Sequence, residues 1–547
     1  MMYQPSDAVD FLVIGAGAAG GVVAKELSSA GFRVVVLEQG PWLKASDFRH
    51  DEVSIGYRSG LTNNHHLQPN TFRTAAGEKA KVRPAVEYGR MVGGGSVHFT
   101  GNYWRFHPDD FRERSVFGPV PGADLRDWPI RYAELEPYYA KAEQELGISG
   151  LGGSNPFDGP RSKPYPLPPM PVKSSGVLFE RGARKLGLHP FPAPVAVLSQ
   201  PYRGRAACSH CGFCESFGCE MNAKSSTLAA LIPGAIQTGR CDLRPLSYVR
   251  RIEVGKDGRV TGAVYFDHLK REVFQRARAV IVCANGAETP RLLLQSKSKL
   301  FPNGLANTHG NVGKYLMFDA GGLVLGLCDH PVNDYKSLVV TRVLHDFYAA
   351  DAKRGFYGGG GLDSRMDYYP AGFALTGLPP GESTWGPEWK KKLSQYYTRL
   401  TGTLAHSTCL AVETNSISLD DEIKDAWGLP AVRVTFQNHP DDLKTVDFLA
   451  ARQKEILDAA GCTKVWLDPW STDTTYSRHL MGSCRMGSDP QWSVVDRWNR
   501  AHDVPNLFIV DGSSLVTSGR QQPTATIQAL AYRLAEHVSE TARRGEL

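Results

Sequence analysis

The first forty residues change their hydrophobic periodicity twice. Residues 10–15 (DFLVIG) and 32–40 (FRVVVLEQG) contain short apolar runs typical of buried strands. Between them, residues 16–31 (AGAAGGVVAKELSSAG) begin with small residues and continue with helical spacing. The order strand, glycine turn, helix, strand predicts one βαβ unit at the start of the chain.

The pattern changes again further along the chain. Residues 152–171 are dense in Gly and Pro, which predicts an extended connection and a crossing into a second domain. Residues 241–286 are strand-like, with a hairpin predicted around Asp257-Gly258 and a buried strand over residues 276–286. Residues 333–466 carry no local motif and are assigned to the second domain.

Composition and charge narrow the class of protein. The chain has 547 residues, which is more than a single hydrophobic core usually organises, so two domains are expected. No apolar run reaches the roughly 18 to 20 residues that span a bilayer, so no transmembrane segment is expected. The net charge of +6 is small and its basic residues are scattered, which argues against nucleic-acid binding. The N-terminus lacks the features of a signal peptide, so the chain is expected to carry no export signal of its own.

Three glycines follow the first predicted strand in the pattern GxGxxG: Gly15, Gly17 and Gly20. Such glycines permit a tight turn, a close approach of the backbone to a pyrophosphate, and close packing of the helix whose positive end meets the phosphates. Glu38 ends the second strand, where its carboxylate can accept hydrogen bonds from ribose hydroxyls. The pattern predicts a dinucleotide site but does not distinguish FAD from NAD.

Further motifs, in the same order, resemble the glucose-methanol-choline (GMC) family of flavin oxidoreductases over essentially the whole chain. They are residues 89–96 (GRMVGGGS) with Gly101-Asn102, residues 284–290 (ANGAETP), residues 479–487 (HLMGSCRMG) and residues 506–512. The resemblance implies that the cofactor is FAD. Beside the GxGxxG glycines and Glu38, the residues that it places against FAD are Arg90, Gly93, Gly94, Ser96, His98, Asn102, Asp511 and Gly512.

The resemblance also implies the fold, which is of the α/β class and α+β overall. A Rossmann-like FAD-binding domain is expected from residues 1–110, 205–320 and 475–547. Residues 111–204 and 321–474 are expected to form a substrate domain built on an antiparallel sheet.

The resemblance assigns two catalytic positions. His479 matches the catalytic histidine of the family, and an imidazole that titrates near neutrality suits removal of a hydroxyl proton. The family's second position is a His or Asn, and here the matching segment places Gln522 there, with Gln521 as the alternative if the register shifts by one. An amide cannot act as a base, so that role falls on His479 alone. Gln522 could instead only cap the following helix.

At His98 the chain also resembles the pyranose oxidases. That group links its flavin covalently through a matching histidine, whereas relatives with noncovalent flavin also carry a histidine here. His98 is therefore expected to be a neighbour of the flavin, with covalent attachment as the alternative.

Four of the ten cysteines fall within one short loop at residues 208–219: Cys208, Cys211, Cys214 and Cys219. Disulfides, structural zinc and an iron–sulfur cluster are the competing interpretations. A single loop that supplies four thiols is more typical of an iron–sulfur site, because zinc sites usually draw pairs of ligands from separate hairpins. The resemblance to bacterial FAD-dependent glucose dehydrogenase favours the same interpretation, with 4Fe-4S or 3Fe-4S left open. His210 could replace one ligand.

The function predicted from the resemblance is that of a dehydrogenase acting on a sugar or glycoside hydroxyl. Two types of member fit, the catalytic subunit of bacterial FAD-dependent glucose dehydrogenase and glucoside 3-dehydrogenase. The compact cysteine loop favours the second type, which oxidises C3 of a glucoside to the 3-keto product. Electrons would then leave through the iron–sulfur cluster to a cytochrome-type acceptor.

The same resemblance implies the location of the protein and its partners. Such members lack their own signal, and a small accessory subunit can carry the export signal for both chains. The expected location is the bacterial periplasm if the chain is co-exported in this way, and the cytoplasm otherwise. One alternative is an oxygen-using pyranose or alcohol oxidase whose cysteines bind zinc or nothing. Another is a noncatalytic flavin-binding subunit, against which the presence of His479 argues.

Overall fold

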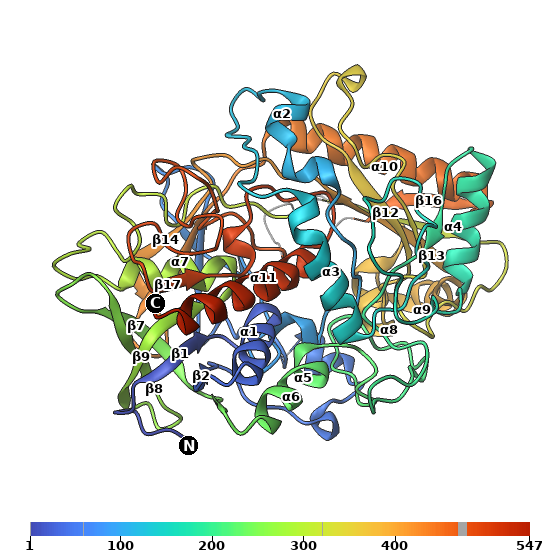
Figure 1. Cartoon of the computed structure of the whole chain (residues 1–547). Helices are drawn as coiled ribbons and strands as arrows, with labels where there is room; N and C mark the ends of the chain where they lie inside the picture. Colours follow the sequence, from blue (N-terminus) through green and yellow to red (C-terminus); the bar gives the residue numbers. More distant parts are fainter. Residues whose placement is uncertain (1, 58–59, 320, 469–477) are drawn as a thin grey trace.

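A computed structural model describes residues 2–57, 60–319, 321–468 and 478–547 (Figure 1). Within these residues the strands form a seven-stranded, a six-stranded and a four-stranded sheet. The seven-stranded sheet has the order β6-β2-β1-β9-β8-β7, with β17 also paired to β9. Its strands are β1 (Val9–Ile14), β2 (Val34–Leu37), β6 (Cys241–Arg244), β7 (Tyr248–Val254), β8 (Val260–Phe266), β9 (Glu272–Val282) and β17 (Leu507–Ile509).

The predicted βαβ unit is confirmed. β1 runs parallel to β2, with Phe11 opposite Val34, and helix α1 (Ala18–Ser29) connects them. All residues of β2 are buried, as is typical of a parallel strand covered on both faces. The Rossmann-like α/β fold class predicted from the sequence is therefore correct.

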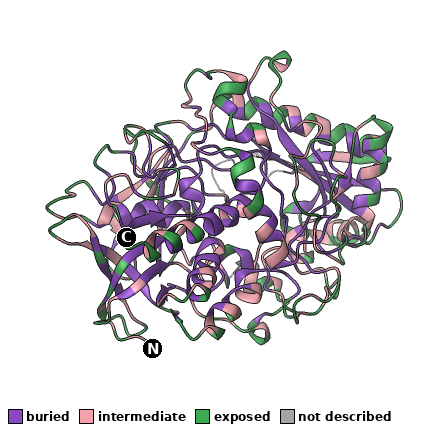
Figure 2. Cartoon of the chain, viewed as in Figure 1, coloured by how far each residue is buried: buried purple, intermediate pink, exposed green. Residues whose placement is uncertain are grey.

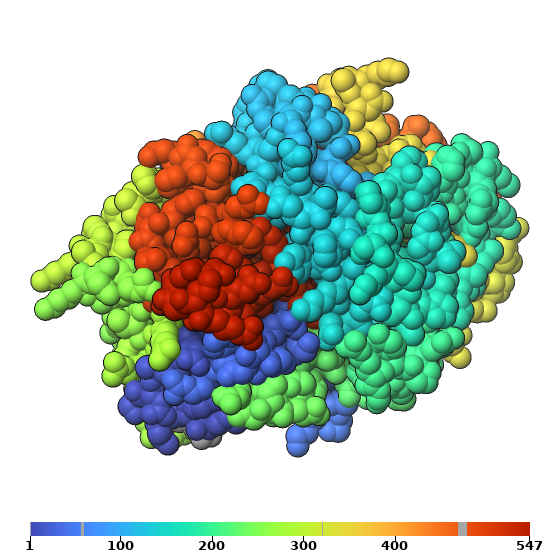
Figure 3. All heavy atoms as spheres, viewed as in Figure 1, coloured from blue at the N-terminus to red at the C-terminus, as the bar shows by residue number. Residues whose placement is uncertain are grey.

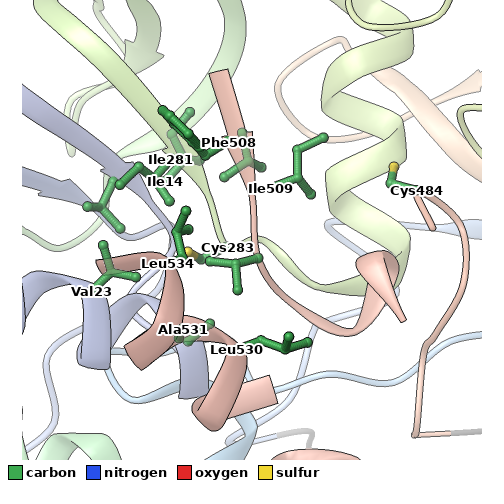
Figure 4. Close-up of a cluster of buried hydrophobic side chains, with 14 of the residues drawn as sticks. Ile14, Val23, Ile281, Cys283, Cys484, Phe508, Ile509, Leu530, Ala531 and Leu534 are labelled. Atoms are coloured by element: carbon green, nitrogen blue, oxygen red, sulfur yellow. The ribbon is translucent and has the colours of Figure 1, made fainter. Parts of the chain in front are cut away.

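The predicted hairpin and buried strand are also confirmed. β7 and β8 pair antiparallel across the turn that contains Gly258, whose φ of +79° is a left-handed conformation that glycine adopts without strain. β9 follows and runs parallel to β1. The buried cluster in Figure 4 lies where β1, β9 and β17 meet α1 and the C-terminal helix α11 (Thr524–Arg543). Cys283 is part of this cluster and packs there as a small apolar residue.

The six-stranded sheet is antiparallel and forms the other half of the molecule. Its order is β16-β10-β13-β12-β11-β5. The strands are β5 (Phe191–Pro192), β10 (Leu323–Leu327), β11 (Arg342–Leu344), β12 (Gly360–Arg365), β13 (Leu400–Ser407) and β16 (Lys464–Leu467). Helices α4 (Ser174–Lys185) and α10 (Pro440–Ala460) pack against it (Figure 1).

The four-stranded sheet joins segments that the sequence analysis assigned to different domains. β3 (Asn70–Arg73) pairs with β15 (Pro430–Thr435), and these strands are flanked by β4 (Lys81–Val82) and β14 (Ser416–Lys424). Residues 70–82 therefore share a sheet with residues 416–435. The expected boundaries at residue 320 and between residues 474 and 475 lie outside the described residues.

The remaining helices connect and cover the sheets. They are α2 (Glu113–Phe117), α3 (Tyr132–Leu146), α5 (Thr227–Ala230), α6 (Ile232–Gln237), α7 (Asn285–Gln295), α8 (Pro370–Gly372) and α9 (Gly386–Tyr396). Residues 152–171, all of which are described, run between α3 and α4 without a helix, as predicted. Among the described helices, none is both long enough and apolar enough to cross a bilayer.

Most of the buried residues lie in and around the sheets (Figure 2). The central strands and the inner face of α11 are buried, whereas the outer faces of α4 and α10 are exposed. α11 packs on α1 and α3, so the C-terminal segment lies against the N-terminal βαβ unit (Figure 3). Segments from both ends of the sequence thus meet around β1 and β9.

Candidate active site

A cavity of about 500 Å³ collects most of the predicted site residues. Its walls come from both the parallel and the antiparallel sheet regions. The predicted residues that line it are Gly15, Gly17, Glu38, Gly94, Ser96, His98, Asn102, His479, Asp511, Gly512 and Gln522. Gly20, Arg90 and Gly93 are not among the residues that line it.

The glycine turn closes tightly at one end of the cavity. A Cβ on Gly15, whose φ is +96°, would lie 2.5 Å from the carbonyl oxygen of Cys283. A Cβ on Gly20 would lie 1.9 Å from the carbonyl oxygen of Gly15, so Gly20 serves helix packing. Gly94, with φ +54°, brings its backbone against Gly17, where a Cβ would lie 2.8 Å from the Gly17 Cα. The start of α1 is thus left open to the cavity, as a pyrophosphate requires.

Glu38 is held at the tip of β2 by the backbone. Its carboxylate accepts hydrogen bonds from the N–H groups of Ala16 (2.9 Å) and Gly40 (2.8 Å). Burial raises the pKa of Glu38 to about 7, although these hydrogen bonds oppose the shift. The side chain is therefore fixed at the cavity wall beside the glycine turn, where a ribose is expected.

Asp511 ties three distant segments together at the cavity. One oxygen accepts from the Ser513 N–H (2.8 Å), and the other accepts from the Asn285 N–H (3.1 Å) and the Thr289 hydroxyl (2.6 Å). Gly512 lies against the backbone of Leu480, where a Cβ would be 2.2 Å from the carbonyl oxygen. The C-terminal segment, the start of α7 and the loop after residue 478 are thereby fixed to one another.

His98 offers a neutral imidazole to the cavity. Burial, together with Lys224 and Arg478, lowers the pKa of His98 to about 3. Its Nε2 is buried and has no hydrogen-bond partner among the described residues. An orphaned ring nitrogen at this wall fits contact with a flavin, and covalent attachment stays a prediction.

The two predicted catalytic side chains line the same cavity. Nδ1 of His479 lies 2.9 Å from Oδ2 of Asp319. Because a carboxylate accepts, Nδ1 carries the proton and the lone pair of neutral His479 is on Nε2. Gln521 instead donates to the carbonyl of Arg105, away from the cavity, so the structure places Gln522 and not Gln521 at the site. The N-cap of α11 is Pro523 without a side-chain hydrogen bond, so Gln522 does not cap that helix.

A third group in this region was not predicted from the sequence. His406, near the end of β13, lines the cavity and lies between two aspartates. Its Nδ1 is 2.7 Å from Asp319 and its Nε2 is 3.1 Å from Asp363. Asp363 is also bound by Arg365 (2.7 Å) and by the amide of Asn102 (3.3 Å). No local motif marks these residues, because each comes from a different segment.

Comparison with known proteins identifies the family. Residues 167–320 and 411–531 match the N- and C-terminal GMC oxidoreductase family models, and residues 13–78 match a Rossmann-like NAD(P)-binding model. The chain is 34% identical over 545 residues to 2-methyl-1,2-propanediol dehydrogenase of Mycolicibacterium austroafricanum, with 98% of this chain and 96% of that protein covered. The chain belongs to the GMC oxidoreductase family. As a GMC oxidoreductase it is an FAD-dependent enzyme that acts on CH–OH groups.

Two further relatives also match over nearly the full length. The gluconate 2-dehydrogenase flavoprotein of Pantoea cypripedii is 29% identical, with 97% of this chain and 94% of that protein covered. The fructose dehydrogenase large subunit of Gluconobacter japonicus is 28% identical, with 98% of each chain covered. The family resemblance drawn from the motifs is therefore confirmed.

The cysteine loop of this GMC oxidoreductase lies beside the cavity. Glu215, within the loop, lines the cavity and pairs with Arg478 at 3.0 Å. Lys224 fixes the loop by donating to the carbonyls of Cys214 (2.6 Å) and Phe217 (2.7 Å). Burial, with a contribution from the neighbouring thiols, raises the pKa of Cys214 to about 12.

The thiols themselves are not arranged as a metal site. Within the described part of the chain, no group of three or more His, Cys, Asp or Glu side chains is placed so that it could hold a metal ion. His210 directs its Nδ1 to the Ser337 hydroxyl (2.9 Å). Four thiols in one loop suit an iron–sulfur cluster by donor type, but their placement does not fit one.

Proposed function

We propose that this GMC oxidoreductase is a dehydrogenase that oxidises a hydroxyl of a sugar or glycoside, with C3 of a glucoside as the position and the 3-keto sugar as the product. One observation carries the proposal. His479 and Gln522 line the same cavity as the glycine turn and Glu38, so a base and an amide lie in the chamber that holds the dinucleotide features.

The side chains of this cavity support removal of a hydroxyl proton. Since Asp319 holds the proton on Nδ1 of His479, the opposite nitrogen, Nε2, can accept the proton of the substrate hydroxyl. The imidazolium that forms is stabilised by the Asp319 carboxylate. Gln522 can donate a hydrogen bond to the substrate oxygen as negative charge develops there. FAD, when bound, supplies the acceptor for the hydride.

The choice of substrate class draws on the relatives and on the loop. Two of the relatives are named for gluconate and fructose, and the third is named for a small diol. The compact spacing of Cys208, Cys211 and Cys214 resembles the glucoside 3-dehydrogenase type and favours C3. The chain would then act with an accessory subunit, for which the "large subunit" in one relative's name is support, and it would be periplasmic when co-exported with that subunit.

Electrons must leave the reduced flavin before the next turnover. Thiol donors and their spacing support an iron–sulfur relay to a cytochrome-type acceptor, whereas the placement of the thiols does not. We therefore assign no step to a cluster. The competing function is an oxygen-using oxidase, which needs no relay.

Product analysis tests the proposal. The FAD-loaded enzyme is incubated with methyl β-glucoside labelled with ¹³C and an artificial electron acceptor, and the carbonyl carbon is located by ¹³C NMR. A ketone at C3 is expected. Oxidation at another carbon would contradict the assignment to C3, and absence of turnover with all sugars and glycosides tested, alongside turnover of simple diols, would contradict the sugar class.

A further inference from the structure

His406 occupies a position for which the described reaction gives no role. It is buried, with 4% of its surface exposed, and so is Asp363, whereas the side chain of Asp319 is 8% exposed. The ring lies 5.6 Å from that of Trp104 in an edge-to-face arrangement. The three side chains come from β13, from β12 and from the segment before β10, so the antiparallel sheet assembles them.

The hydrogen bonds define the protonation of His406. Its Nδ1 faces a carboxylate oxygen of Asp319 at 2.7 Å, and its Nε2 faces a carboxylate oxygen of Asp363 at 3.1 Å. Carboxylates accept hydrogen bonds and cannot donate them when ionised, so both ring nitrogens must carry protons. His406 is therefore an imidazolium in this arrangement.

The charges around the ring agree with this assignment. Burial opposes the charge on His406, but Asp319 and Asp363 outweigh it and raise the pKa of His406 to about 9. The other charged or titratable groups near the ring are Arg365, which neutralises part of Asp363, and His479, which shares Asp319. Burial lowers the pKa of His345, and the charges of His107 and His406 add to this shift, but His345 does not line the cavity.

An imidazolium constrains the neighbouring amide. The Nε2 atoms of Gln522 and His406 lie 2.6 Å apart, and Oε1 of Gln522 is buried without a partner among the described residues. Two donors cannot bond to each other, and the two ends of an amide are assigned from the hydrogen-bond network around them. Rotating the amide by half a turn places Oε1 against the imidazolium and moves the NH₂ to the buried position that has no partner among the described residues, so its N–H groups still need an acceptor.

We propose that His406, held as an imidazolium by Asp319 and Asp363, is a positioning residue that fixes Gln522 with its oxygen toward His406 and its NH₂ toward the substrate oxygen. This inference rests on the proposed function. The amide becomes a dedicated donor at the second catalytic position, where it stabilises charge on the substrate oxygen while His479 takes the proton. No proton leaves His406 during the reaction, so it shapes the site without being a base.

The protonation state is tested directly by NMR. The FAD-loaded enzyme, labelled with ¹⁵N in its histidines, is examined at pH 7.5, and the signals absent from His406→Gln are assigned to His406. Two protonated ring nitrogens are expected, with a titration near pH 9. A neutral ring at pH 7.5 would overturn the proposal. This readout needs no substrate, so it holds even if the proposed function fails.

Kinetics test the link to Gln522. The charge on His406 is present below its pKa and lost above it, so the anaerobic rate of flavin reduction by substrate is expected to fall as pH rises through about 9. His406→Gln should lower this rate about tenfold to a hundredfold, as for loss of a charge-assisted hydrogen bond, and should remove the alkaline fall. Gln522→Ala should cost a similar factor. The double variant should be no slower than either single variant. A double variant whose loss of rate equals the product of the two single losses would show that His406 and Gln522 act independently and would overturn the proposal.

Two further variants serve as a substitute for His406→Gln and as a control. His406→Gln removes the cation that Asp319 and Asp363 share, so Asp363→Asn serves where that variant fails to fold. It is expected to move the alkaline fall to lower pH, and an unmoved fall would overturn the proposal. His189→Gln is the matched control, because His189 also bonds an aspartate, Asp346 at 2.7 Å, but is exposed and outside the cavity. Its rate and pH profile should equal those of the parent.

Discussion

Asp319 is the residue that joins the two histidines of the active site. Its Oδ2 accepts from His406 at 2.7 Å and from His479 at 2.9 Å. Although burial opposes ionisation, His406 and His479 lower the pKa of Asp319, so it remains a carboxylate across the working range of pH. Both the tautomer of the base and the charge on His406 therefore depend on one side chain.

Replacing Asp319 by Asn should disturb the orientation of His479 without changing the binding of FAD. The amide no longer enforces a proton on Nδ1 of His479, so the rate of flavin reduction should fall by roughly 10²- to 10⁴-fold while bound FAD is unchanged. Asp329→Asn is the control, because Asp329 also accepts from Nδ1 of a histidine, His330, but its side chain is 74% exposed. A rate within about threefold of the parent in Asp319→Asn would contradict the assigned role.

Sequence patterns could predict some of these residues and not others. Gly15 and Glu38 were predictable because a turn and the strand tip beside it belong to one short unit of chain. Asp319, Asp363 and His406 were not, because they meet only after non-adjacent strands pair, and no spacing along the chain records that pairing.

At the scale of elements, the contact between Gly17 and Gly94 joins the start of α1 to the 3₁₀ turn at Gly94–Val97. The approach is so close that a methyl group at Gly94 would strike backbone, which cannot move aside as a flexible side chain can. The positive φ of +54° adds strain for any residue other than glycine.

Gly94→Ala should therefore weaken the binding of FAD at least about tenfold, since the strain and clash together cost more than about 1.4 kcal/mol at the site. Far-UV circular dichroism should remain that of the parent. Gly77→Ala is the control, because a Cβ there meets nothing within 4 Å. Full retention of FAD in Gly94→Ala would contradict the placement of the pyrophosphate beside this contact.

Elements formed by neighbouring residues were predictable from the sequence, whereas pairings between distant strands were not. The β1–α1–β2 unit and the β7–β8 hairpin were predicted because their periodicity and turn residues are local. The sheet that pairs β3 with β15 was not, because its partners lie far apart in the sequence and were assigned to separate domains.

At the scale of the whole molecule, the cavity lies where the parallel and antiparallel sheet regions meet, and the cysteine loop reaches it through Glu215. Chemical analysis of anaerobically purified protein tests whether this loop carries a relay. An iron–sulfur cluster in the loop would give iron and acid-labile sulfide at about three or four equivalents each per FAD. Flavin without iron or sulfide would remove the relay and favour direct reoxidation by oxygen.

The most direct test of the central claim is a single-turnover measurement of flavin reduction. The FAD-loaded enzyme is mixed without oxygen with a glucoside, and the flavin absorbance is followed in the parent and in His479→Asn, with His189→Gln as the control. The account predicts rapid bleaching in the parent and control, and a rate lowered roughly 10²- to 10⁴-fold in His479→Asn, as for loss of a general base. Equal bleaching in all three proteins would contradict the assignment of His479 as the base.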